Sequence, residues 1–407
     1  MSSAYLAVEL DGAGRHPAAW RLFDARPGEL FTAGYWTELA QLADGAGLDF
    51  LAIPDSFVPP TEGQAGLVRG RLDAVAIAAR VAPLTRTVGL VPTATVTHTE
   101  PFHLSKAIAT LDFVSLGRAG WQPEVSRTRD EADLFGRKAW SDGPAPADPL
   151  WRELADAVEV VVRLWDSWED DAVIRDQATG RYVDRDKLHY IDFAGEFFSV
   201  KGPSITPRSP QAHPPVVLRA DEPEALPVVG RWAQVVRIAA PDLAAASAAR
   251  ARVRDAVAAA GRDPDEVAVL LDVETLLADT TDQAQATLAQ LDGWAGAGGF
   301  ALRTHTQRAA TAEVIGTPAA LADLIEDAVR GRAADGVTLV PLALPSGLRF
   351  IADRLVPLLA ERELRSAADG GPLRIGAQSK AAADHPATLR DRFGLVRPAN
   401  YFTEARA

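Results

Sequence analysis

Short runs of hydrophobic residues alternate along the chain with longer segments in which apolar residues recur at helical spacing. The short runs have the length of buried strands, and most are followed by a helical pattern whose end is marked by Gly or Pro. Strands that alternate with helices form parallel sheets, and eight such units favour a closed barrel over an open doubly wound sheet. We therefore predict an α/β fold, a (β/α)8 TIM barrel. Its strands are expected at residues 4–10, 48–54, 87–95, 117–121, 215–220, 233–239, 267–278 and 336–342.

The alternation stops after the expected fourth strand. Residues 123–148 are polar and contain several prolines, and residues 166–214 are again mostly polar, with short strand-like pieces. Between them, Leu150 to Trp165 has the apolar spacing of a long helix. We interpret about 123–214 as an insertion into the barrel, because it is too short and too polar to build a core of its own.

The C-terminal part of the chain shows a second irregular region. Residues 294–316 look like a loop, and the tail 366–407 is rich in Ala, Gly and Asp and looks irregular. We therefore expect a single barrel domain over 1–407, with insertions after the fourth strand and near the C-terminus.

Composition narrows the classes of function. With 47% hydrophobic and 24% charged residues, the chain has ordinary globular composition. A net charge of −13 disfavours nucleic-acid binding, since phosphate contacts need a basic face. The absence of cysteine excludes disulfides and thiolate chemistry. Because no signal peptide and no apolar run of roughly 18 residues is visible, we expect a cytoplasmic protein without membrane contact.

Several sequence motifs that carry chemistry are absent. The chain has no GxGxxG after its first strand, no GxxxxGK[ST] and no GxSxG. Its 7 His show no HxH or HExxH spacing, so we expect no metal. The adjacent acidic pairs Asp170–Asp171 and Asp221–Glu222 are expected in solvated loops, because neighbours on a strand point to opposite sides.

Candidate site residues follow from the barrel itself, because function in this fold sits at the C-terminal ends of the strands. The residues at these ends are polar, aromatic and partly basic, which suits an organic ligand with hydrogen-bonding edges. The alternative is that they only satisfy loop backbone. The candidates are Asp55, Thr95, Thr97, His98, Trp121, Gln122, Arg219, Arg303 and His305.

Longer strings along most of the chain resemble the luciferase-like flavin monooxygenase superfamily. The resemblance is to the branch that contains nitrilotriacetate monooxygenase, the pristinamycin IIA synthase large subunit and dibenzothiophene-sulfone monooxygenase. The strings keep the family's order. They are HPAAWR (16–21), GLDFLAIPDS (47–56), EPFHLSKAIATLDFVSLGRAGW (100–121), RLWDSWEDDAVIRDQATGRYVD (163–184), GEFFSVKGPSITPRSPQAHPPVV (195–217), GTPAALADLI (316–325), VPLLAERE (356–363) and TLRDRFGLVRP (388–398).

The resemblance implies a two-component enzyme. Reduced flavin, usually FMN, comes from a separate flavin reductase, and O2 adds at flavin C4a to give a peroxide that oxidises a small organic substrate. Homodimers or homotetramers are usual in such a family. Carried over by position, Asp55 and the hydroxyls of Thr95 and Thr97 lie near the flavin. Trp121 and Gln122 match a strand end that is typically Trp-Asn in this branch.

Two segments depart from the branch. Pro123–Ser126 replaces a typical Val-Thr-Ser, and Arg219–Glu224 replaces the Gln-Ala-Gly-x-Ser-x-x-Gly segment that receives the FMN phosphate. Glycine and serine are lost, a proline removes one N–H donor, and carboxylates replace a neutral anion site. Arg219 or Arg231 could offset this charge.

These departures leave three hypotheses open. The chain is a flavin-dependent monooxygenase that uses FMN, or a same-fold oxidoreductase that uses another flavin such as a deazaflavin. The third hypothesis is a non-flavin pseudoenzyme or binding subunit. For the substrate, His98, Arg303 and His305 are the candidate polar contacts, and Arg303 points to an anionic substrate.

Overall fold

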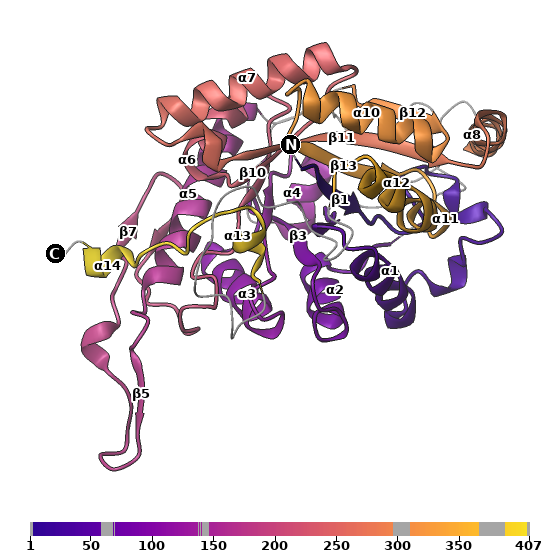
Figure 1. Ribbon diagram of the computed structural model, residues 1–407. Coiled ribbons are helices and arrows are strands. Elements are labelled where there is room, and N and C mark those ends of the chain that lie inside the picture. The colour runs from indigo at the N-terminus through magenta and orange to yellow at the C-terminus, as the bar shows by residue number, and fades with distance from the viewer. Residues whose placement is uncertain are drawn as a thin grey trace.

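The computed structural model describes residues 3–57, 68, 70–136, 138, 140, 146–295, 310–365 and 387–404. Nine described strands form one sheet, and eight of them follow one another around a barrel in the order β4-β3-β2-β1-β13-β11-β10-β9 (Figure 1). Their bounds are β1 (Tyr5–Glu9), β2 (Phe50–Ile53), β3 (Gly89–Thr95), β4 (Gln122–Glu124), β9 (Val217–Arg219), β10 (Val235–Ile238), β11 (Ala268–Leu277) and β13 (Gly336–Pro341).

The barrel is closed between β4 and β9, the two strands at the ends of this order. Every neighbouring pair in the order is parallel. A parallel bridge between Trp121 and Val216 joins β4 to β9. The Trp121 N–H donates to Pro215 O at 2.9 Å, and the Val217 N–H donates to Trp121 O at 2.8 Å. The predicted (β/α)8 barrel is therefore confirmed.

Helices follow the barrel strands and cover the outside of the wall (Figure 1). Local sequence starts several of them: Asp73, Asp242 and Thr317 each accept a hydrogen bond from a first-turn N–H, and Pro101 and Pro318 open α3 and α10. The bounds are α1 (Ala33–Gly45), α2 (Ala74–Val81), α3 (Pro101–Val114), α4 (Arg129–Phe135), α5 (Ala147–Asp166), α6 (Leu226–Trp232), α7 (Leu243–Ala259), α8 (Thr281–Ala295), α10 (Pro318–Arg330), α11 (Ser346–Phe350), the π-helical η7 (Ile351–Leu355) and α12 (Val356–Glu361).

Among the described residues, apolar side chains form three separate cores, two of which lie on either side of the strand wall. The third is small and lies within the insertion, so the expectation that the insertion builds no core of its own is wrong; it consists of Val160, Leu164, Ile191 and Phe193. Alternate residues of a strand belong to different cores, as the twofold period of a strand requires: on β1, Leu6 and Val8 join the outer core, and Ala7 joins the inner one. The inner core fills the lumen towards the N-terminal ends of the strands. It consists of Ala7, Phe50, Ala52, Val91, Val217, Val235, Leu270 and Leu389.

Leu389 comes from the C-terminal tail, which closes the N-terminal end of the barrel. It belongs to α13 (Leu389–Arg392), and a Cβ added at Gly89 would lie 2.5 Å from its Cδ1. Phe393 continues the seal, with its ring centroid 4.7 Å from that of Tyr5 at the start of β1. The prediction of an irregular tail is correct for residues 393–400, which form no helix or strand, and wrong for α13 and for α14 (Tyr401–Glu404), which packs on α5.

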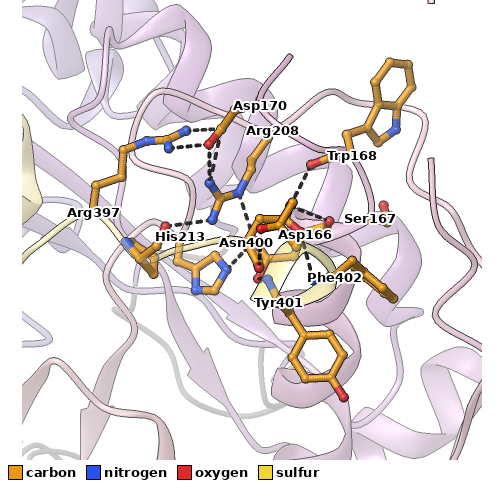
Figure 2. A network of polar contacts seen from close by, with 12 residues as sticks. Asp166, Ser167, Trp168, Asp170, Arg208, His213, Arg397, Asn400, Tyr401 and Phe402 are labelled. Carbon is orange, nitrogen blue, oxygen red and sulfur yellow. Dashed lines mark hydrogen bonds and ion pairs between the residues drawn. The ribbon is translucent and has the colours of Figure 1, made fainter. Parts of the chain in front are cut away.

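Figure 2 shows how the tail is tied to the insertion. Arg397 donates to both oxygens of Asp170 at 2.6 and 2.9 Å, and Arg208 joins Asp170 to Asp166. Asn400 donates to Asp166 O at 2.8 Å. Hydrogen bonding by Arg397 lowers the pKa of Asp170 to about 2, with Arg208 adding to the effect and burial opposing it. The expectation that Asp170 lies in a simple solvated loop is wrong, since it is the centre of an ionic clamp.

The insertion after β4 also contains two short hairpins. One joins β5 (Val173–Asp176) to β6 (Arg181–Val183) and projects well away from the barrel (Figure 1), and the other joins β7 (Phe193–Ala194) to β8 (Ser199–Val200). A strand was missed in the expected loop 294–316, because β12 (Ala312–Gly316) pairs with β11. Among the described residues, no helix is both long and apolar enough to cross a membrane.

Candidate active site

Charged side chains fill the lumen above the inner apolar core, towards the C-terminal ends of the strands. Arg237 is at the centre: it contacts Glu9 at 2.7 Å, Asp272 at 2.9 Å and, through Nη1, Gln122 Oε1 at 3.2 Å. All four side chains are buried. Burial alone would lower the pKa of Arg237, but Asp272 and Glu9 outweigh it and raise the pKa. The group is therefore a fixed, ionised layer under the barrel mouth.

Arg219 belongs to the same layer. Its Nη1 lies 2.7 Å from Asp272 Oδ2, and its Nε donates to Asp221 Oδ2 at 2.7 Å. The other oxygen of Asp221 accepts the Ala239 N–H at 3.0 Å. Two carboxylates thus neutralise Arg219 inside the barrel, and Arg231 pairs with Glu159 at 2.8 Å. Arg219 and Arg231 are therefore both paired already and do not offset the negative charge of the loop after β9. The expectation that Asp221 is a solvated loop residue is wrong, because it is bonded to Arg219 and to the Ala239 N–H.

The candidates on β3 and β4 divide between the two sides of the barrel wall. Thr95 lies on the same side as inner-core Val91, and its buried hydroxyl has no hydrogen-bond partner among the described residues. Thr97 Oγ1 accepts the Ser126 N–H at 2.9 Å. Trp121 belongs to the outer core and lies 6.3 Å, centroid to centroid, from Trp165 of α5. Of the Trp121–Gln122 pair, only Gln122 faces the lumen.

Asp55 has a structural task at the end of β2. Its carboxylate accepts the Ser56 N–H at 2.8 Å and the Ala74 N–H, at the first residue of α2, at 2.9 Å. Burial raises the pKa of Asp55, and these hydrogen bonds oppose the rise. The side chain anchors the start of α2, so its proposed place beside a flavin stays a prediction.

His98 lies in an aromatic group after β3. Its ring is stacked on Phe135 with centroids 5.1 Å apart and lies 5.8 Å from Trp140, and Phe57 contacts Phe135 at 4.7 Å. Its side chain is buried, with 4% of the residue exposed. Neither ring nitrogen has a hydrogen-bond partner among the described residues. Burial, followed by the charge of Lys138, lowers the pKa of His98, so the imidazole is neutral at pH 7.

The loop after β9 contains a contact that the sequence did not reveal. Glu222 Oε2 accepts from Arg127 Nη2 at 2.8 Å and from Trp151 Nε1 at 3.1 Å. These three residues come from the β9 loop, the β4 loop and α5. The only sequence signal was a basic residue directly after the altered strand-four segment.

Arg303 and His305 lie outside the described residues, so their role as substrate contacts stays a prediction. Within the described ranges, no group of three or more His, Asp or Glu could hold a metal ion.

Comparisons with known proteins agree with this architecture. The family model described as luciferase-like monooxygenase matches residues 9–336. N-acetyl-S-(2-succino)cysteine monooxygenase of Bacillus subtilis (strain 168) is 28% identical, with 98% of each chain covered. Nitrilotriacetate monooxygenase component A of Aminobacter aminovorans is 30% identical, with 95% of each covered.

Solved structures show the same fold. Long-chain alkane monooxygenase superposes with a TM-score of 0.81 at 22% identity, covering 97% of this chain and 96% of that one. A riboflavin lyase, solved with modified FMN and riboflavin, gives a TM-score of 0.82 at 23% identity, covering 98% and 97%. The resemblance inferred from the sequence strings is confirmed: the chain belongs to the luciferase-like monooxygenases, a family of oxidoreductase enzymes.

Proposed function

We propose that this chain is the oxygenase of a two-component flavin-dependent monooxygenase. It would take a reduced flavin from a separate reductase and use O2 to oxidise a small organic substrate. The observation that carries the proposal is a set of buried polar groups at the barrel mouth that have no hydrogen-bond partner among the described residues, namely Thr95 Oγ1, Ser126 Oγ and both nitrogens of His98. Buried polar groups normally have partners, so these favour a bound ligand.

A flavin fits this site in part. Gln122, held by Arg237, and the Thr95 hydroxyl suit the polar edge of a flavin ring. The flavin, when reduced, would supply the electrons for oxygen activation. The phosphate of FMN fits poorly at the β9 loop. Pro223 has no N–H, and the Ala225 and Leu226 N–H groups already donate to Glu222 O and Pro223 O. Asp221 and Glu222 add negative charge.

The remaining residues would bind and orient the substrate. A neutral His98 donates one hydrogen bond and accepts one, and Phe57, Phe135 and Trp140 give it an apolar surrounding that excludes water. Arg303 and His305 complete the proposed substrate contacts. We also propose that barrel, insertion and tail act as one domain and that the chain forms a homodimer or homotetramer.

The test is an anaerobic titration of the purified protein with reduced flavins, followed by air and a reductase with candidate substrates. Binding followed by substrate-dependent product formation supports the proposal. If no reduced flavin binds at hundreds of micromolar, the proposal is wrong.

The contact between Arg127 and Glu222 favours a second candidate. An anion site that is already filled by the chain suits a deazaflavin enzyme or a non-flavin binding subunit of the same fold. Binding of a deazaflavin, or of no flavin, in the same titration would select it.

A further inference from the structure

Two strong anion-binding donors converge on a single carboxylate oxygen at the barrel mouth. Arg127 Nη2 and the indole N–H of Trp151 both reach Glu222 Oε2, at 2.8 and 3.1 Å. A guanidinium and an N–H that meet at one point are the donors that bind phosphate in proteins. Here the anion they hold is part of the chain.

This carboxylate sits where the family resemblance places the flavin phosphate, at the head of the segment after β9. Glu222 precedes the 3-10 turn η5 (Pro223–Ala225), which runs into α6. The backbone there offers little to a second anion, because Pro223 lacks an N–H and the next two amides after Glu224 are used within the turn. The Glu222 side chain is 29% exposed, so it borders the solvent-accessible mouth.

A phosphate dianion brought to this point would meet a fixed negative charge. Arg127, which could bind the phosphate, is already paired with Glu222. The carboxylates of Asp221 and Glu224 lie on the same loop. Like charges at about 4 Å repel strongly near a protein surface, although salt and Arg127 screen part of the effect. An uncharged hydroxyl at the same point has no such penalty.

We propose that Glu222 serves as a built-in anion that takes the place of the flavin phosphate, and that the chain therefore selects riboflavin over FMN. The inference rests on the proposed function, since it concerns the flavin of that site. Riboflavin and FMN share the ring and the ribityl chain and differ only at the terminal phosphate, so the comparison isolates this contact.

The experiment measures binding of reduced riboflavin and reduced FMN by anaerobic quenching of tryptophan fluorescence, with the full-length protein. The wild type is expected to bind riboflavin at least about tenfold more tightly than FMN. Glu222→Ser frees Arg127 and Trp151 and should tighten FMN by about tenfold or more, with riboflavin changed less than about threefold. If the serine variant does not fold, Glu222→Gln, which keeps the shape and removes the charge, is measured in its place.

The matched control is Glu224→Ser, which removes the same charge from an exposed side chain of the same loop. It should change the ratio of the two affinities by less than about threefold, because exposed charges are screened. A separate readout uses inorganic phosphate, which should raise the thermal unfolding midpoint of Glu222→Ser and not that of the wild type.

The outcomes separate the inference from the proposed function. Equal affinity of the wild type for both flavins, or a ratio that Glu222→Ser leaves unchanged, overturns the inference alone. Failure of both flavins to bind either protein overturns the inference and the proposed function together.

Discussion

At the N-terminal end of the barrel, Leu389 and Phe393 from the tail fill the lumen with apolar contacts. At the C-terminal end, Glu9, Arg237 and Asp272 form an ionic floor in the same lumen. Above them lie hydroxyls and an imidazole that have no hydrogen-bond partner in the part of the chain that the structure describes. The first end gains stability from packing. The second combines a paired ionic floor with polar groups that add no stability of their own, which is the relation expected between a scaffold and the proposed active site.

The largest effect is expected from the ionic floor. Arg237→Met removes the shared partner of Glu9 and Asp272 and leaves uncompensated charge in the lumen. Breaking a buried pair in this way costs about 3–5 kcal/mol. Urea denaturation at pH 7 measures the loss. Arg237→Lys, which keeps the charge, should recover part of it, and equal losses for the two variants would show that packing and not charge holds this end.

The apolar end should respond almost as strongly. Leu389→Ala opens a cavity in the inner core, and such a change costs about 2–5 kcal/mol in the free energy of unfolding. The matched control lies in the same tail: Val396 is 84% exposed, and Val396→Ala should change stability by less than about 0.5 kcal/mol. If both variants lose the same stability, the tail does not close the barrel as described.

The ionic clamp of the tail gives a smaller, pH-dependent effect. The folded pKa of Asp170, about 2, lies below its ordinary value of 3.8. The stabilisation by ionised Asp170 is therefore complete above about pH 4–5 and is lost as pH falls through 2. Because its side chain is 53% exposed, solvent screening limits the gain to about 1 kcal/mol.

The comparison of wild type with Asp170→Asn tests this clamp. The difference in unfolding free energy should be present at pH 7 and shrink steadily below pH 4. A difference that stays constant down to pH 2.5 would mean that the two arginines do not stabilise the ionised carboxylate.

The smallest stability effect, with the opposite sign, is expected at the mouth. His98→Phe keeps the contact with Phe135 and removes buried nitrogens that have no hydrogen-bond partner among the described residues, so the protein should become more stable by up to about 1 kcal/mol. Substrate turnover in the reconstituted system should fall at least about tenfold. A clear loss of stability would show that His98 is a core residue of the scaffold.

Most of the strand wall was predictable from sequence because its strands are apolar runs between turn residues. The exception is β4, whose sequence QPE is polar and which lies directly after the fourth strand expected at 117–121. The strand β12 was missed, since AEVIG is short and begins beside residues that read as loop. The ionic floor had a signal that was not used: Glu9, Arg237 and Asp272 each interrupt an apolar strand, and charges buried in a strand must be paired. For the pair Arg127–Glu222, the basic residue after the altered strand-four segment was visible but its partner was not, because nothing local links loops so far apart in sequence.

The placement of Leu389 also affects how the molecule is made. Every strand of the barrel precedes this residue in the chain, so on the ribosome the wall can assemble while its lumen is still open at one end. Domains fold as synthesis proceeds, and chains with exposed apolar surface are prone to aggregate at that stage. The barrel core is thus completed only when α13 has been synthesised. A chain that stalls before residue 387 lacks Leu389, so the N-terminal end of its lumen stays open.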